Sequence, residues 1–165
     1  MLTERLEVRP PVEADRDRFV ELFCDPDFMI FSGGVHDHAS ANARFDGMLA
    51  NAADIPFAKQ PVVERATGLI IGYTGVAWFD FEEQARLEYG YGLVPDARGR
   101  GYATEAGSAL ITLAEKTFEG EMLAIIDPTN TASQQVIGKL GFTYWKQAEI
   151  DGFLDNLYRR SFGPP

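Results

Sequence analysis

The spacing of apolar and polar residues changes several times along the chain, and each change marks a boundary between predicted elements. RLEVRP alternates and ends at two prolines, which predicts a short first strand. VEADRDRFVELFCD carries its apolar residues at helical spacing, with a charged side opposite, and predicts a helix. We expect an irregular loop over PDFMIFSGGVHDH, and a second helix over SANARFDGMLANAA with Ser40 as its N-cap.

Three strand-like runs occupy the centre of the chain: FAKQPVVERAT, LIIGYTGVAWFDF and RLEYGYGLV. Thr67–Gly68 separates the first two runs, and Glu82–Gln84 separates the second and third. Short polar turns of this kind join antiparallel neighbours. The runs therefore predict an antiparallel meander.

Helical spacing returns from Tyr102 to Phe118 and is followed by a buried strand, EMLAIID, and a short helix, NTASQQVIGKL, which Gly141 closes. FTYWKQAEI and FLDNLYRRSF are the last two predicted strands, joined by Asp151–Gly152, a strong hairpin signal. This order predicts a single mixed α/β domain, residues 1–165, with a strand–helix–strand crossover around residues 98–115.

The composition narrows the class of protein. Apolar residues make up 45% and charged residues 24% of the chain, as in an ordinary globular domain. The net charge is 15 − 25 = −10, which argues against a nucleic-acid-binding surface. The one cysteine, Cys24, excludes an internal disulfide and is predicted to be a small core residue. MLTERLEVRPP lacks an apolar signal region and no long apolar run follows, so we expect a soluble, cytoplasmic protein without membrane contact.

The turn RGRGYA, directly before the third predicted helix, is the clearest candidate for a ligand site. Gly99 and Gly101 permit a tight turn and a close approach of the backbone to a ligand. The first N–H groups of the helix and the guanidinium groups of Arg98 and Arg100 attract anions. A pyrophosphate fits such a cradle.

Three phosphate-binding motifs and an ordinary glycine-rich turn compete for this stretch. The Gly-Lys-Ser/Thr of a P-loop is absent, and Thr104 stands where a dinucleotide fingerprint has its third glycine. The coenzyme A turn, R/Q-x-x-G-x-G/A, matches at Arg98, Gly101 and Ala103.

Four stretches together resemble the GNAT acetyltransferase superfamily, and within it the ribosomal-protein N-terminal (Rim-type) branch. They are TERLEVRPPVEADRDRFVELFCDPDFMIFS, LEYGYGLVPDARGRGYATEA, NTASQQVIGKLGF, and KQAE followed by DNLY. The resemblance implies the GNAT fold, a mixed, mostly antiparallel sheet of about seven strands flanked by four helices. It also implies acetyl-CoA as co-substrate.

The resemblance implies which residues would bind coenzyme A. Backbone groups of Leu93 and Val94 would pair with the pantetheine arm, and Asn130 would hydrogen-bond it near the thioester. Asn130 is also a good helix N-cap, and both roles are compatible. The pyrophosphate would be held by the six residues Arg98, Gly99, Arg100, Gly101, Tyr102 and Ala103.

Transfer of an acyl group from a thioester to an amine needs a neutral amine. The site also has to tolerate or protonate the thiolate that leaves. Glu149 matches the glutamate that the Rim-type branch uses as base, although the segment before it is shortened here, and Glu88 lies where many GNAT enzymes place an acid. For each, a solvated strand glutamate is the alternative. Ser133 matches the serine proposed to protonate the thiolate, and Ile137 replaces the tyrosine that is common in the superfamily.

The histidine-containing loop, GGVHDH, would border the acceptor entrance. Two histidines and one aspartate in a loop rarely bind metal, so we expect no metal. We assign His36, Asp37 and Phe31 to the acceptor wall or to plain surface.

The expected reaction is transfer of acetyl from acetyl-CoA to a primary amine, with a protein or peptide N-terminal α-amine as the favoured acceptor. A small-molecule amine, such as a polyamine or antibiotic, is the alternative. A third possibility is an acyl-CoA-binding module without catalysis. The sequence leaves open whether the protein is a monomer or a homodimer.

Overall fold

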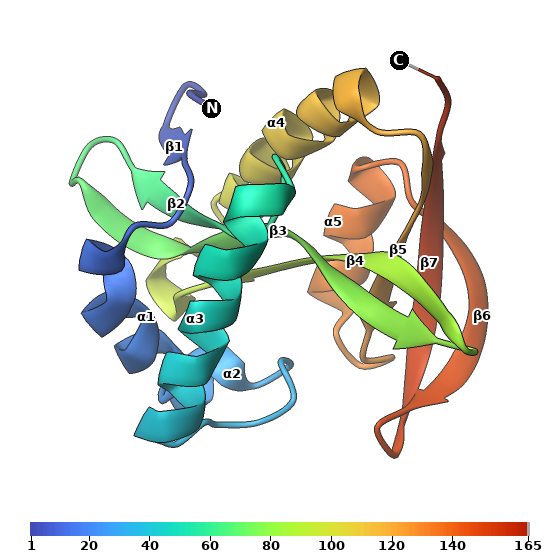
Figure 1. Ribbon diagram of the computed structural model, residues 1–165, viewed down its shortest axis with the longest axis horizontal. Helices are drawn as coiled ribbons and strands as arrows, with labels where there is room; N and C mark the ends of the chain where they lie inside the picture. The colour runs from blue at the N-terminus through green and yellow to red at the C-terminus, as the bar shows by residue number, and fades with distance from the viewer. Residues whose placement is uncertain (165) are drawn as a thin grey trace.

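The computed structural model describes residues 1–164, and its centre is one seven-stranded sheet in the order β1-β2-β3-β4-β5-β7-β6 (Figure 1). Every neighbouring pair is antiparallel except β4 and β5, which are parallel. The predicted meander and the C-terminal hairpin are both confirmed. The strands are β1 (Leu6–Val8), β2 (Gln60–Glu64), β3 (Leu69–Phe81), β4 (Gln84–Leu93), β5 (Gly120–Ile126), β6 (Thr143–Ile150) and β7 (Phe153–Phe162).

Four main helices flank the sheet, as predicted: α1 (Arg16–Phe23), α3 (His38–Asp54), α4 (Tyr102–Thr117) and α5 (Thr131–Lys139). Single 3₁₀ turns precede α1 (η1, Glu13–Asp15) and α4 (η2, Pro95–Ala97). The fold class is therefore the predicted one, a mixed, mostly antiparallel sheet with helices on both faces. None of the helices in residues 1–164 combines the length and the apolar character needed to cross a bilayer.

Two local predictions between α1 and α3 are wrong. The segment predicted as loop contains a short helix, α2 (Pro26–Met29), which Asp25 caps by accepting hydrogen bonds from the amides of Asp27 and Phe28. Helix α3 begins at His38, and its N-cap is Asp37, whose side chain accepts from the Ser40 amide at 2.8 Å. Aspartate and serine are comparable caps, so the sequence alone did not separate the two positions.

The two faces of the sheet are covered by different helices (Figure 1). Helices α1, α2 and α3 bury an aromatic cluster around Phe19, Phe23 and Phe45 against Tyr73 of β3. Helices α4 and α5 cover the other face, where Tyr89 of β4 packs with Leu110. A ligand that enters the sheet between strands therefore meets a different helix layer on each side.

The parallel pair β4–β5 is the point where the sheet opens. Only Leu87↔Met122 and Glu88↔Leu123 are paired, although both strands continue beyond these residues. We call the unpaired part, beyond Glu88 on β4 and Leu123 on β5, the fork. Helix α4 begins past the end of β4 and α5 past the end of β5, so both helix N-termini lie beyond the open end of the fork.

Candidate active site

The β4 side of the fork presents free backbone edge. The Val94 amide donates to the Ile71 carbonyl at 2.9 Å, on the β3 side, and the Val94 carbonyl accepts from Ala97. Backbone groups alternate in direction along a strand, so those of Tyr89, Tyr91 and Leu93 point away from β3 and into the fork. Of the two predicted pantetheine residues, Leu93 thus lies on the open edge with its amide unpaired within residues 1–164 and its carbonyl accepting from Arg98, whereas both backbone groups of Val94 are already paired within the sheet and turn.

The glycine-arginine turn at the open end of the fork has the predicted shape. Gly99 and Gly101 have φ values of +71° and +81°, in the region that side chains avoid. Gly101 is the N-cap of α4 and has no side chain to cap it, and the first helical hydrogen bond runs from the Glu105 amide to the Gly101 carbonyl. The N–H groups of residues 102–104 therefore have no partner within the helix, as an anion site requires.

The side chains of this turn are anchored to the protein. Arg98 donates to the backbone carbonyls of Leu93 at 3.0 Å and of Asp27 at 2.7 Å, which are neutral acceptors, and it forms no salt bridge within the described residues 1–164. Arg100 forms a salt bridge with Glu64 at 3.2 Å. Tyr102 is 3% exposed and its hydroxyl donates to Glu64, so only its backbone amide, like that of half-buried Ala103, is placed to contact a ligand.

Asn130 and Ser133 lie on the other side of the fork, at the start of α5. Asn130 is the N-cap, as predicted, and its Oδ1 accepts from the Ser133 amide at 3.1 Å. The Ser133 hydroxyl lies 2.9 Å from the hydroxyl of Tyr91 on β4. Burial raises the pKa of Tyr91, although its hydrogen bond with Ser133 works in the opposite direction, so Tyr91 stays protonated at neutral pH.

The two candidate bases are far apart in the sheet. Glu88 stands at the closed end of the fork, on the face covered by α3, and its Oε2 is 3.5 Å from Nζ of Lys59. Glu149 is exposed on the edge strand β6, opposite Leu154. The strand registers place Glu149 on the α5 face, so the structure does not bring the two glutamates together.

The predicted acceptor residues differ in their surroundings. His36 is half-buried, and its Nε2 is 3.4 Å from Nη1 of Arg44 on α3. Burial and the charge of Arg44 lower the pKa of His36. Asp37 caps α3, and Phe31 is 49% exposed.

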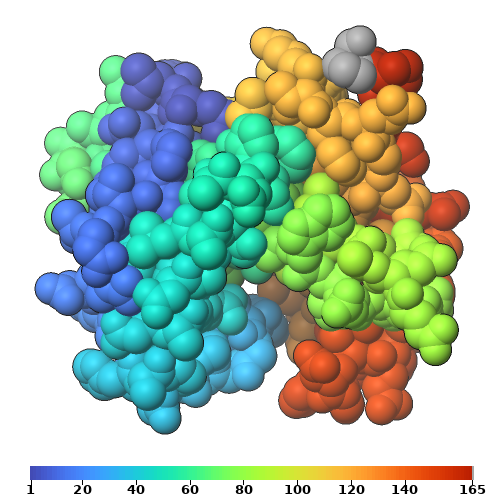
Figure 2. Space-filling view, viewed as in Figure 1, coloured from blue at the N-terminus to red at the C-terminus, as the bar shows by residue number. Residues whose placement is uncertain are grey.

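A cavity of about 190 Å³ lies between α3 and β3, on the face of the sheet that carries Glu88. Figure 2 shows the corresponding hollow between the teal surface of α3 and the green hairpin of β3 and β4. Arg44, Asn51, Lys59 and Tyr73 are its polar lining residues. A larger hollow, lined by Cys24 among others, lies between α1 and α3, and no residue of the sheet lines it.

The opening between β4 and β5 leads to the Gly99–Gly101 turn and to the first N–H groups of α4. Residues 5–143 match the family model described as an acetyltransferase (GNAT) domain. The chain belongs to the GNAT acetyltransferase family. It is therefore an acetyl-CoA-dependent N-acetyltransferase, and the family by itself does not fix the acceptor.

Individual relatives agree with this assignment. The Bacillus subtilis protein named "Uncharacterized protein YkkB" is 32% identical over 151 residues, which cover 88% of this chain and 86% of the relative. The crystal structure of an acetyltransferase from Agrobacterium tumefaciens superposes with a TM-score of 0.83 at 28% identity, over 97% of this GNAT domain and 92% of the other chain. RimL, described as a ribosomal L7/L12 α-N-protein acetyltransferase in complex with coenzyme A, has a TM-score of 0.78 at 16% identity over 98% and 97% of the two chains, which shows the shared fold alone.

Three residues near the fork were not singled out from the sequence. Tyr91 had a detectable signal, because the alternation in LEYGYGLV puts its hydroxyl on the same face as buried Leu87 and Leu93. Arg44 lies on α3 next to buried Phe45, again a charged side chain beside an apolar stripe. Lys59 had no such signal, since it lies in the turn before β2, and only the tertiary structure brings it to Glu88.

Proposed function

We propose that this GNAT domain acetylates the α-amine of a protein or peptide N-terminus, as the Rim-type resemblance implies. The observation that carries the assignment of the active site is the fork itself. Its β4 edge runs from Glu88 at the closed end to the Gly99–Gly101 turn at the open end, with Asn130 and Ser133 opposite. One elongated ligand lying in the fork reaches a phosphate cradle, a hydrogen-bonding edge and a carboxylate in sequence.

The coenzyme-binding roles follow from this path. The N–H groups of residues 102–104 and the charge of Arg98 hold the pyrophosphate. The open backbone edge at Leu93 and Tyr91 binds the amides of the pantetheine arm as an added strand does, and we assign Leu93 rather than Val94 because the Leu93 amide points into the fork, whereas both backbone groups of Val94 are paired. Asn130 keeps its cap bond through Oδ1 and has its amide NH₂ free to donate to the arm.

The reaction joins the amine nitrogen to the acyl carbon and breaks the carbon–sulfur bond, with one proton leaving nitrogen and one reaching sulfur. An α-amine of pKa about 7.8 is roughly 10% neutral at pH 7, whereas a lysine amine of pKa about 10.4 is neutral in roughly one molecule in two thousand. An N-terminal acceptor therefore asks little of the base. We favour Glu88 as that base because it lies at the closed end of the fork, and Glu149 remains the alternative.

The proton for sulfur comes from the Ser133–Tyr91 pair. Tyr91 stays protonated because of its burial, so it can donate to Ser133 while the Ser133 hydroxyl gives its proton to the departing thiolate, and the pair then regains one proton from solvent. The pair replaces the tyrosine of α5 for which this chain has the buried residue Ile137. A thiolate of pKa about 8.5 leaves tolerably unaided, so we expect the contribution to be modest.

The test is release of free coenzyme A from acetyl-CoA against a panel of N-terminal peptides, lysine peptides, polyamines and aminoglycosides. We expect turnover with N-terminal peptides and at least tenfold lower kcat/KM with lysine peptides. Preference for polyamines or aminoglycosides would contradict the proposed acceptor, and no turnover with any amine would favour a non-catalytic acyl-CoA-binding module.

A further inference from the structure

The cavity between α3 and β3 carries more positive charge than its surroundings explain. Two cations, Arg44 and Lys59, line it, and among residues 1–164 the carboxylate within salt-bridge distance of either is Glu88, at 3.5 Å from Lys59. Because one carboxylate faces two cations, the cavity has a local excess of one positive charge in a protein of net charge −10. This excess needs a reason.

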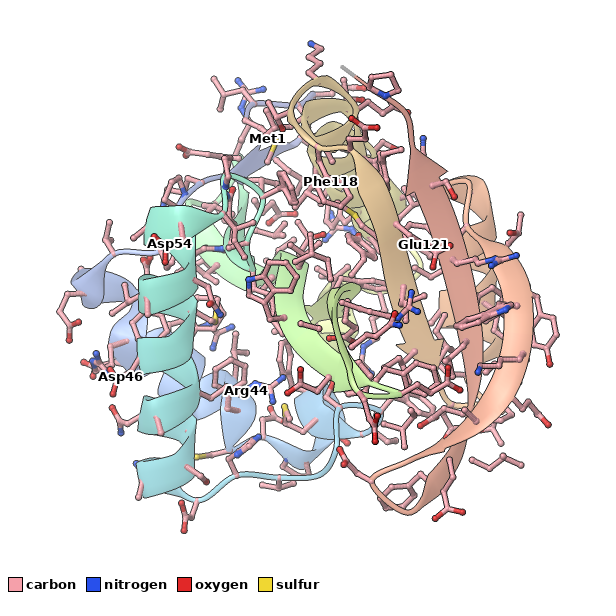
Figure 3. All side chains as sticks on the ribbon, turned by 45° about the vertical axis from the view of Figure 1, so that its right-hand side comes forward. Met1, Arg44, Asp46, Asp54, Phe118 and Glu121 are labelled. Atoms are coloured by element: carbon pink, nitrogen blue, oxygen red, sulfur yellow. The ribbon has the colours of Figure 1, made fainter. Side chains whose placement is uncertain are left out.

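Arg44 has the surroundings of a binding residue. Its guanidinium is half-buried, lies 4.9 Å from the centre of the Phe23 ring and contacts His36, whose lowered pKa keeps it neutral. Other arginines on the same side of the molecule face carboxylates, as Arg16 faces Asp46 at 2.7 Å, but no carboxylate among residues 1–164 lies within salt-bridge distance of Arg44. Figure 3 shows Arg44 on the side of α3 that faces the sheet, with Asp46 on the outer side.

Two further hydrogen-bonding groups line the same cavity. The Tyr73 ring is 4% exposed and packs against Phe23 and Phe28, and its hydroxyl has no hydrogen-bond partner in the described chain. The side-chain amide of Asn51, about two helical turns beyond Arg44 on α3, likewise has none among residues 1–164. Both groups line the cavity and make no hydrogen bond within residues 1–164, so they are available to donate to a ligand bound there.

The ligand has to reach Glu88 as well. Gly90 leaves the space beside both groups open, since a Cβ there would lie 3.5 Å from Oε1 of Glu88 and 3.7 Å from Nζ of Lys59. An amine held by Glu88 is therefore only a few bonds from an anion held by Lys59 and Arg44. The cavity volume of about 190 Å³ corresponds to roughly six water molecules at about 30 Å³ each, which suits a carboxylate on a short chain.

We propose that this cavity binds a carboxylate of the acceptor, so that the substrate is an α-amine with a carboxylate on the same residue. The proposal rests on the acetyltransfer function proposed above; it requires a carboxylate on the acceptor residue and admits a free amino acid beside the peptide N-terminus. Arg44 and Lys59 bind the carboxylate, Tyr73 and Asn51 donate to it, and Glu88 receives the amine. A free amino acid and a peptide that begins with Asp or Glu share this chemistry.

The same charges disfavour polyamines and aminoglycosides as acceptors. A polyamine or an aminoglycoside brings several cations, which would meet Arg44 and Lys59 as like charges at close range. Only the amine at Glu88 would find an opposite charge. A neutral N-terminal residue would leave Arg44 without a partner.

The experiment compares each carboxylate acceptor with its uncharged isostere in the coenzyme-release assay. The pairs are free amino acids against their carboxamides, and peptides beginning with Asp or Glu against those beginning with Asn or Gln. For at least one of the two sources we expect kcat/KM to be at least about tenfold higher for the carboxylate, mostly through KM. Arg44→Gln and Lys59→Gln should each reduce this ratio toward one, whereas Lys116→Gln, an exposed charge at the end of α4, should preserve it.

The outcomes separate the two proposals. Turnover of amines with no carboxylate preference in either source, or an unchanged ratio in Arg44→Gln and Lys59→Gln, overturns the carboxylate site while leaving the acetyltransfer function in place. A binding readout covers a protein without turnover: in the presence of coenzyme A, an N-acetyl amino acid should raise the melting temperature more than its carboxamide, and equal shifts would also overturn the site. If the carboxylate is preferred only among free amino acids, or only among peptides that begin with an acidic residue, that class is the source of the acceptor.

Discussion

The surroundings of Glu88 suit a carboxylate that receives a cationic amine. It is partly shielded at the closed end of the fork, and Lys59, at 3.5 Å, is its one charged partner within residues 1–164. This contact is long for a salt bridge, so an incoming ammonium group can compete with Lys59 for the carboxylate. Glu149, exposed on an edge strand, lacks such a setting.

Replacing each glutamate separates base catalysis from mere charge. We expect Glu88→Gln to lower kcat by roughly a hundredfold at pH 7 and much less at pH 9, where an α-amine has lost its proton without help. Glu149→Gln is the matched control and should keep the wild-type pH profile. Steady-state kinetics from pH 6 to pH 9.5 measure both variants.

Three other results would change the assignment. The reverse pattern would make Glu149 the base. A raised KM with intact kcat in Glu88→Gln would assign that residue to amine recognition alone. If neither variant alters the pH profile, deprotonation comes from solvent or from His36.

Tyr91 allows a second prediction at this scale. Tyr91→Phe removes one hydroxyl from the Ser133 contact and should lower kcat by roughly threefold to tenfold at pH 7, with a smaller effect above about pH 8.5, where the thiolate needs no proton. The KM for acetyl-CoA should change little. Tyr144→Phe, which removes an exposed hydroxyl on β6, is the control and should behave as the wild type. A less stable Tyr91→Phe protein with wild-type kcat would show that the hydroxyl has only a structural role.

The N-terminus of helix α4 has to meet two requirements. Its first N–H groups have to stay free for a phosphate, and the chain has to turn sharply from η2 into the helix. Glycine at position 101 meets both, because it adopts φ +81° and offers no capping side chain. The missing cap lowers helix stability, which is the expected sign of a helix end reserved for a ligand.

The corresponding prediction compares two glycines with the same backbone strain. Gly101→Asp and Gly152→Asp each place a side chain at positive φ, +81° and +84°, and each should cost roughly 1–2 kcal/mol of stability. Acetyl-CoA at about 100 times Kd should stabilise the wild type and Gly152→Asp by about 2.7 kcal/mol. Gly101→Asp should lose this gain, since its carboxylate occupies the phosphate site.

Thermal melts with and without acetyl-CoA measure the difference. No shift in the wild type at millimolar acetyl-CoA would argue against coenzyme binding by this chain. An equal shift in all three proteins would place the pyrophosphate elsewhere.

Acidic groups tie the N-terminal segment to the rest of the molecule. Buried Asp15 accepts two hydrogen bonds at 2.7 Å from Arg9, and Glu105 of α4 accepts from Thr3 and Arg5. Burial alone would raise the pKa of both carboxyls, but these hydrogen bonds together outweigh it and lower the pKa of each. Their stabilisation is therefore complete above the unfolded-state pKa values of about 4 and is lost as the pH falls through the lower folded-state values.

The acid sensitivity of the whole protein should follow from this sign. We expect Asp15→Asn and Glu105→Gln to reduce the free energy of unfolding by about 2 kcal/mol each at pH 7 and by much less at pH 3. Glu119→Gln, at an exposed carboxylate, should have little effect at either pH. Urea denaturation at pH 3, 5 and 7 measures the free energy of unfolding of the wild type and of each variant. If the two variants lose the same free energy of unfolding at every pH, the shape of these side chains and not their charge makes the contacts important.

The sequence by itself determined the order and type of the main elements, because local signals specify them. Alternation predicted the meander, helical spacing predicted four helices, and Asn130, Gly141 and Asp151–Gly152 marked ends and turns that the structure has. The turn at Gly99–Gly101 was also local, since glycine and a helix start are enough to make it. Where two local signals were equally good, as for Ser40 and Asp37, the sequence could not choose.

Only the tertiary structure decided what meets at the fork. The end of pairing at Glu88 and Leu123, the contact between Tyr91 and Ser133, and the approach of Lys59 to Glu88 join residues that are 29 to 42 positions apart. Such contacts depend on strand register and helix packing, and a shift of one residue in register would turn each side chain to the other face. The cavity beside Arg44 depends on the same packing, so the local sequence does not show that Arg44 and Lys59 face one cavity.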